Sequence, residues 1–122
     1  MPESGLLLVF SRLKEGSDIS SVDFQRWYDE VHLPDVLATS GIKEGYRYNN
    51  VLPNAGWQFL ALYPVSDVAF LGTPEFDAIP SHGKHVFKGS ATDHAEFELR
   101  FYELIQIFEP RDIKVFGLLP AV

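Results

Sequence analysis

The stretch that decides the fold is Phe24-Gln25-Arg26-Trp27-Tyr28-Asp29-Glu30-Val31-His32-Leu33-Pro34-Asp35-Val36. Large apolar side chains recur in it at spacings of three and four residues: Phe24, Trp27, Tyr28 and Val31. This spacing predicts the buried stripe of an amphipathic helix. His32 continues the stripe one turn beyond Tyr28. The sequence therefore predicts a histidine on the buried side of this helix.

Both ends of the helix carry signals. The run Ser20-Ser21-Val22-Asp23 offers a hydroxyl cap with an acid three residues later, which is typical of a helix start. Pro34 has no N–H, and its ring crowds the carbonyl of Glu30. We therefore expect a break or kink directly after His32, and the end of the helical segment near residues 38–39, ahead of Gly41.

Length and charge limit the possible functions. A chain of 122 residues is long enough for one domain, spanning residues 1–122. The net charge is −7, and the ten basic residues are scattered, which argues against nucleic acid and anionic membrane as partners. Cysteine is absent, so disulfides and thiolate chemistry are excluded. No basic segment precedes the short apolar run at residues 6–10, and a soluble cytoplasmic protein is the default expectation.

The remaining elements follow from alternation and turn signals. Strands are expected at residues 5–12, 42–52, 57–65 and 95–108, with short helical segments capped by Ser66-Asp67 and by Thr73-Pro74. Within 42–52, Ile42, Tyr46 and Tyr48 are expected on one face. The apolar tail at residues 111–122 is expected to pack on the domain or on a neighbouring copy.

The order of these elements is βαββαβ, the pattern of the α+β ferredoxin-like fold. Helices then cover one face of the sheet. The other face is open and rich in aromatic residues, and in so small a domain we expect it to be buried against a second copy.

A family resemblance supports this architecture. The run Phe24-x-x-Trp27-Tyr28-x-x-x-His32-x-Pro34, the later Gly41-Ile42-x-x-x-Tyr46-Arg47-Tyr48 and the strand Phe97-x-x-Arg100-x-Tyr102 resemble the EthD-like family of dimeric α+β barrel proteins. The resemblance implies a homodimer whose sheets pack face to face, with a small-molecule pocket between each sheet and its own helices. Fungal members of the family resemble decarboxylases, cyclases or dehydratase-like enzymes that act on aromatic polyketides without metal or organic cofactor. The family's histidine corresponds to His32.

Histidines are the candidate proton-transfer groups. In apolar surroundings near a proline break, His32 is expected to act as general base or acid with a pKa tuned across neutrality. Tyr28 would orient it or donate to a substrate oxygen, or else serve only as core. His82 and His85 lie on a loop expected to rim the pocket, where each is either a second proton-transfer group or an exposed loop residue.

Other residues are candidates for holding a substrate. Aromatic side chains can wall a flat aromatic ligand, although most of them must also form the core; we expect contacts from Trp27, Tyr46, Phe76 and Phe87. Asp35 is a candidate acceptor that fixes the tautomer of His32, or a solvated carboxylate. The spacing of His82 and His85 also allows a metal site with His32. No carboxylate lies at a suitable spacing, so no metal is expected.

The function expected from the sequence is a cofactor-independent enzyme of polyketide-type metabolism. Decarboxylation is the first expectation, and aldol-type or pericyclic cyclisation is the second. Three alternatives stay open: a cofactor-free or haem-using monooxygenase on the same fold, a binding protein that carries a metabolite without converting it, and a domain that serves only assembly.

Overall fold

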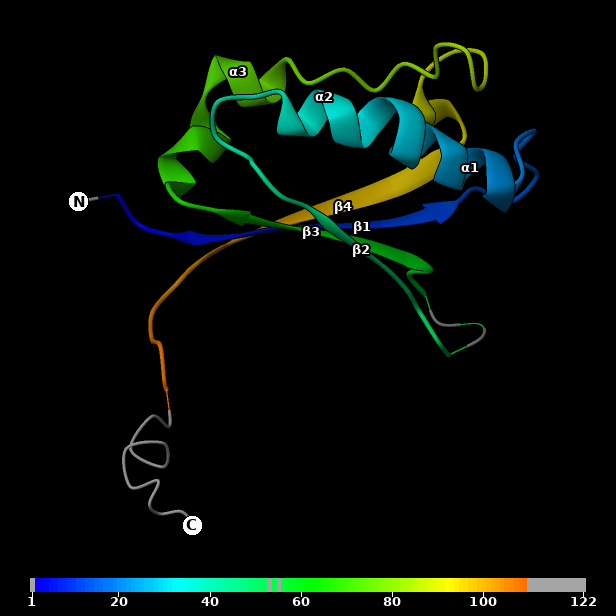
Figure 1. Cartoon of the computed structure of the whole chain (residues 1–122). Coiled ribbons are helices and arrows are strands. Elements are labelled where there is room, and N and C mark those ends of the chain that lie inside the picture. Colours follow the sequence, from blue (N-terminus) through cyan, green and yellow to red (C-terminus); the bar gives the residue numbers. More distant parts are fainter. Residues whose placement is uncertain (1, 53, 55, 110–122) are drawn as a thin grey trace, which may run out of the picture.

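A four-stranded antiparallel sheet forms the base of the molecule in the computed structural model, which describes residues 2–52, 54 and 56–109. Its strands are β1 (Gly5–Leu13), β2 (Tyr46–Asn49), β3 (Phe59–Val65) and β4 (Ala95–Glu103). They lie in the order β2-β3-β1-β4, so the central β1 pairs with both β3 and β4 (Figure 1). This is the α+β ferredoxin-like architecture expected from the sequence.

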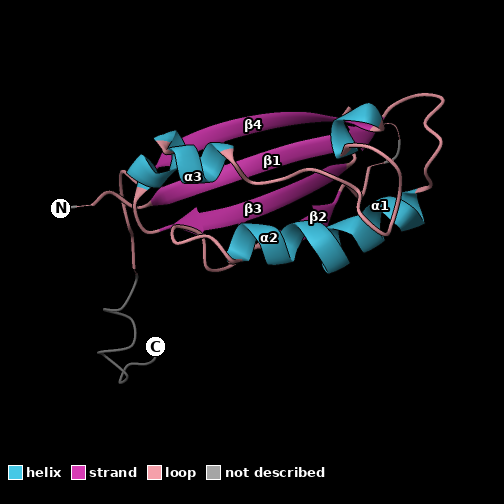
Figure 2. Ribbon diagram, turned by 90° about the horizontal axis from the view of Figure 1, so that it is seen from above, coloured by secondary structure: helices cyan, strands magenta, loops and turns pink. Residues whose placement is uncertain are grey.

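Helical segments cover one face of the sheet (Figure 2). The first consists of α1 (Ser21–Trp27), a π-helical turn (Tyr28–His32) and α2 (Leu33–Leu37). The Ser20 hydroxyl accepts a hydrogen bond from the Asp23 amide at 3.1 Å, which confirms the predicted N-cap. The second covering segment is divided into short pieces: a 3₁₀ turn (Val68–Gly72), α3 (Pro74–Asp77) and a 3₁₀ turn (Ala91–Asp93).

The helix does not break after His32, where a break or kink was expected. His32 keeps helical angles, with φ −76° and ψ −47°, and the chain continues into α2. Pro34 cannot donate to the Glu30 carbonyl, and the backbone accommodates this by widening for one turn, in which the Leu33 amide bonds to the Tyr28 carbonyl five residues back. The helical segment still ends at Leu37, as its stop signals predict.

Two predicted strands are shorter than expected. The 42–52 strand begins only at Tyr46, and Ile42 lies fully buried ahead of it, whereas Tyr46 and Tyr48 are exposed. The 95–108 strand ends at Glu103, the partner of Gly5 at the start of β1, and one further backbone hydrogen bond follows, from the Leu104 amide to the Ser4 carbonyl at 2.7 Å. The expectation for the 111–122 tail lies outside the described residues.

Alternation along the strands separates two faces. The helix-covered face holds the core, in which Leu7, Val9, Ala61 and Tyr63 pack below the aromatic stripe of the first helix. On the open face, apolar and aromatic side chains remain partly exposed: Leu6, Leu8, Phe10, Tyr46, Tyr48, Leu60 and Leu62. None of the helices in the described part of the chain is both long and apolar enough to span a bilayer.

Candidate active site

A cavity of about 320 Å³ lies between the helix-covered face of the sheet and the helical segments. It falls within the size range of small-molecule sites. The strands contribute Leu7, Val9, Tyr63, Phe97 and Leu99 to its wall, and the first helical segment contributes Trp27, His32 and Val36. The remaining wall comes from α3 and the segments that follow it: Phe76, Asp77, Ile79, Ser81 and Thr92. The wall is therefore mostly apolar, with a few polar groups.

His32 is positioned by the π-helical turn and by two aromatic neighbours. Its ring stacks on Trp27 with centroids 4.5 Å apart and an interplanar angle of 14°. The Tyr28 ring meets it edge-on at 5.4 Å. The imidazole Nδ1 is buried and has no hydrogen-bond partner among the described residues. The ring is thus held by packing and by a hydrogen bond to the Pro80 backbone rather than by a carboxylate.

Burial sets the protonation state of His32. Desolvation lowers its pKa to about 4, against an ordinary value of 6.5. A hydrogen bond to the Pro80 backbone and the charge of Asp35 oppose this shift, and the charge of Arg47 adds to it. The expected titration near neutrality is therefore corrected to a lower range. At neutral pH the imidazole is uncharged and is suited to accept a proton.

Trp27 joins the helix to the loop above the cavity. Its indole Nε1–H donates to the His82 carbonyl at 3.0 Å. The side chain is almost fully buried and also forms part of the cavity wall. Trp27 thus contacts both the candidate base and the loop that carries Ser81.

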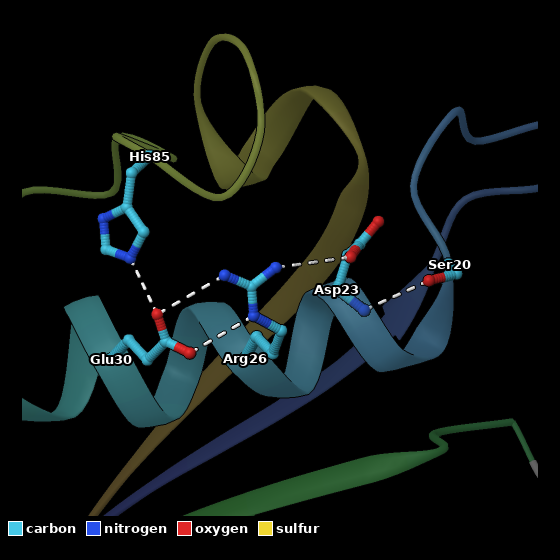
Figure 3. A network of polar contacts seen from close by, with 5 residues as sticks. All are labelled: Ser20, Asp23, Arg26, Glu30 and His85. Atoms are coloured by element: carbon cyan, nitrogen blue, oxygen red, sulfur yellow. Dashed lines mark hydrogen bonds and ion pairs between the residues drawn. The ribbon is translucent and has the colours of Figure 1, made fainter.

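The two loop histidines point outward. His85 Nε2 lies 2.7 Å from a Glu30 carboxylate oxygen on the outer surface of the helix, where Glu30 also pairs with Arg26 (Figure 3). His82 is exposed, and its Nδ1 accepts a hydrogen bond from the Lys84 amide at 2.9 Å. Neither side chain forms part of the cavity wall.

Tyr28 and Phe87 lie behind the wall. Tyr28 is buried, the Arg47 guanidinium lies 4.2 Å from its ring centre, and burial raises its pKa to about 12. Phe87 packs against Trp27 with ring centroids 5.9 Å apart. Both therefore support Trp27 and His32 from outside the cavity.

Of the other three residues expected to contact the substrate, one lies in the cavity wall and two lie outside it. Phe76 lies in the wall. Asp35 is half-buried outside the wall and acts on His32 through its charge. The structure does not place Tyr46 at the cavity, because it extends from the open face of the sheet and its hydroxyl donates to Glu44 at 2.6 Å.

Tyr63 is the cavity residue that the sequence reasoning missed. Burial raises the pKa of its phenol, so the hydroxyl stays protonated and can donate a hydrogen bond. That hydroxyl is buried without a partner among the described residues. Strict alternation along β3 gives Phe59, Ala61, Tyr63 and Val65 one common face, and this signal identifies Tyr63 as inward-facing. Asp77, Ser81 and Thr92 had no periodic signal.

The wall thus combines a neutral base with a neutral donor. An uncharged imidazole can remove a proton from carbon or oxygen, and a phenol in the same wall can stabilise the resulting oxyanion. Lysine and arginine are absent from the residues identified in the wall. In the described ranges, histidine, aspartate and glutamate form no group of three or more that could hold a metal ion.

Sequence comparison relates the chain to a fungal protein. The chain matches no family model. It is 30% identical over 111 residues to core atranone cluster protein 1 of Stachybotrys chlorohalonatus, an alignment that covers 88% of this chain and 47% of that protein. The chain thus spans about half the length of this curated relative.

Two solved structures share the architecture. A hydroxynitrile lyase from Passiflora edulis superposes with a TM-score of 0.55 at 19% identity, over 89% of this chain and 100% of the lyase. A Dabb-family protein with a ferredoxin-like fold from Mesorhizobium loti gives a TM-score of 0.55 at 14% identity, over 87% and 99% of the two chains. The fold is therefore the ferredoxin-like fold of Dabb-type relatives.

Proposed function

We propose that this chain is an EthD-like, cofactor-independent lyase or cyclase that acts on an aromatic polyketide-type molecule by proton transfer at His32. The observation that carries the proposal is the position of an uncharged histidine in the wall of an apolar cavity. Tyr63 is the proposed hydrogen-bond donor to a substrate oxygen. Trp27 and Phe76 are the proposed contacts to the flat faces of the substrate.

Decarboxylation is the first reaction that we propose. A carboxylate in a wall without lysine or arginine is poorly solvated, whereas the transition state spreads its charge into the ring system. A carboxylate beside His32 would raise the pKa of the imidazole and favour the protonated ring. The imidazole takes this proton from solvent when the substrate binds; carbon dioxide then leaves with cleavage of the C–C bond, and His32 donates the proton to the carbanionic carbon.

Cyclisation by an aldol-type step is the second candidate, because the low pKa of His32 keeps the imidazole unprotonated at neutral pH and so able to accept a proton. His32 would remove a proton from the carbon beside a ketone, with the enolate oxygen held by the Tyr63 hydroxyl. The enolate carbon then attacks a second carbonyl of the same substrate. The alkoxide formed takes the proton back from His32, so the enzyme is restored.

The comparisons support this proposal without identifying the substrate. The name of the Stachybotrys relative associates that protein with an atranone cluster, which supports small-molecule biosynthesis as the setting. The Passiflora structure supports lyase chemistry as compatible with the fold. A homodimer with the open faces of the two sheets in contact completes the proposal, and the partly exposed apolar side chains of that face support it.

The test is mass spectrometry and chromatography of aromatic polyketide acids and their open-chain polyketone precursors after incubation with the purified protein. Loss of carbon dioxide would support a decarboxylase, and a retention shift at unchanged mass or with loss of water would support a cyclase. His32→Ala should abolish either change. His85→Ala, a histidine outside the cavity wall, is the matched control and should keep it. Binding without conversion would instead support a carrier, and oxygen addition a monooxygenase.

A further inference from the structure

The candidate active-site cavity has an enclosed inner end and an exposed mouth. Trp27 and Tyr63 in its wall are each only 1% exposed. Asp77, Thr92 and Leu99 belong to the same wall but are exposed to solvent, and they mark the mouth. A ligand in this cavity therefore has one end among buried groups and the other end close to water.

The mouth lies towards the β4 edge of the sheet. Leu99 is a residue of β4, the outermost strand beside β1. Asp77 is the last residue of α3, and Thr92 lies in the 3₁₀ turn that precedes β4. Figure 2 shows α3 towards the β4 side of the sheet and α2 towards the β2 side. The mouth is thus formed by α3, this turn and the edge strand, whereas His32 belongs to the first helical segment.

Asp77 gives the mouth a negative charge. Among the residues identified in the wall it is the one charged group at neutral pH, because His32 is uncharged there. None of the ion pairs in the described part of the chain includes Asp77. The mouth therefore presents a carboxylate that accepts hydrogen bonds and repels other carboxylates.

The hydroxyl groups of the wall are already engaged with one another. Ser81 Oγ and Ser90 Oγ lie 2.8 Å apart, and Ser90 Oγ lies 3.1 Å from Thr92 Oγ1. Ser90 joins the two wall hydroxyls into a chain. Asp77 is therefore the acceptor in the mouth that remains for a group of the ligand.

We propose that Asp77 determines specificity by accepting a hydrogen bond from a hydroxyl group at the outer end of the substrate and by excluding a carboxylate from that end. This inference rests on the proposed function and narrows its substrate class to hydroxylated aromatic molecules with a neutral outer end. The reacting group then lies at the inner end, beside His32 and the Tyr63 hydroxyl. For an aromatic acid, Asp77 also fixes which end enters first, because the reversed orientation would bring two carboxylates together.

Two naphthalene acids with the same ring skeleton test this role. One is 6-hydroxynaphthalene-2-carboxylic acid, whose outer end is a hydroxyl group, and the other is naphthalene-2,6-dicarboxylic acid, whose outer end is a carboxylate. Isothermal titration calorimetry with the full-length protein at pH 7 should show tighter binding of the hydroxy acid. Asp77→Asn keeps an acceptor oxygen but removes the charge, so it should bind the dicarboxylate about 5- to 10-fold more tightly than wild type. This gain should shrink at high salt.

Glu15→Gln is the matched control, because Glu15 is an exposed acid between β1 and α1 and lies outside the cavity wall. It should leave both affinities unchanged. Equal dicarboxylate affinity in wild type and Asp77→Asn, or an equal gain in the control, would overturn the role of Asp77. Binding of neither acid by wild type would overturn the substrate class. The titrations need no turnover, so discrimination without a His32-dependent reaction would overturn the proposed chemistry alone.

Discussion

At the scale of single residues, the account depends on His32 being uncharged. The folded-state pKa of about 4 lies below the ordinary 6.5, so the unfolded chain binds more protons between these two values. The free energy of unfolding should therefore fall as the pH is lowered from about 6.5 towards 4. The shift corresponds to at most about 3 kcal/mol.

Urea unfolding at several pH values measures this effect. Wild type should lose more stability between pH 6.5 and 4 than His32→Gln, which keeps the size and polarity of the side chain but does not titrate in this range. If the free energy of unfolding fell with pH by the same amount in both proteins, the proposed burial of an uncharged His32 would be contradicted. The imidazole proton shifts of His32 by NMR provide the same pKa without unfolding.

Tyr63 carries a second prediction. Its hydroxyl is buried without a partner among the described residues, and removing an unsatisfied polar group costs little stability. Tyr63→Phe should therefore keep the wild-type Tm or raise it. Turnover should fall by about 100-fold or more if the phenol stabilises an oxyanion.

Tyr102→Phe is the control for Tyr63→Phe, because that ring is exposed on the open face of the sheet. It should leave turnover unchanged. A Tyr63→Phe protein with full activity would remove Tyr63 from the proposed mechanism. A protein with lowered Tm would show instead that the hydroxyl is satisfied in the fold.

His32, Trp27 and Phe76 were predicted from the sequence as site residues, and all three line the cavity. Helical spacing and aromatic side chains indicate which residues are buried. Sequence reasoning did not find Tyr63, although the alternation of β3 carried the signal. It also placed His82 and His85 at the rim of the pocket, whereas both side chains point outward, because the sequence of a loop does not specify which way its side chains point. The pKa of His32 depends on how deeply the ring is buried, and the spacing of residues in the sequence does not give that depth.

At the scale of elements, the first helical segment combines a predicted start with an unpredicted interior. Ser20 caps it as the sequence indicates, but Pro34 widens one turn instead of ending the helix. The rule that proline interrupts helical hydrogen bonding held, because the Glu30 carbonyl loses a donor. The outcome, a π-helical turn or a break, is decided by tertiary packing of the residues on either side.

The cap gives a quantitative prediction. Ser20→Ala removes the acceptor for the Asp23 amide and should lower the free energy of unfolding by about 1 kcal/mol. Ser21→Ala, at the next position and exposed, is the control and should be close to neutral. Differential scanning calorimetry of the two variants compares them directly. Equal effects would show that the cap hydrogen bond contributes nothing measurable.

At the scale of the whole molecule, the βαββαβ order was predictable because each strand carries its own alternation. The second helical segment and the lengths of β2 and β4 were less predictable. Strand length depends on the partner strand: β4 ends at Glu103, opposite Gly5, where β1 begins. Local sequence does not contain that information.

The partly exposed apolar side chains on the open face of the sheet predict a homodimer. Light scattering at micromolar concentration should give the mass of two chains. Leu62→Glu places a charge on the open face, opposite Tyr46 of the neighbouring strand, and should shift the mass towards one chain. Val22→Glu on the helix side is the control. A wild-type monomer would contradict the proposed packing of the sheets.

The central claim is that His32 moves a proton at a substrate carbon, and turnover in D₂O tests it most directly. If wild type releases carbon dioxide from a substrate, mass spectrometry should detect deuterium at the carbon that lost it; a cyclisation is instead followed by conversion alone. The His32→Gln reaction should lose both conversion and label. Unlabelled product of a decarboxylation by wild type, or full conversion by His32→Gln in either reaction, would contradict the account.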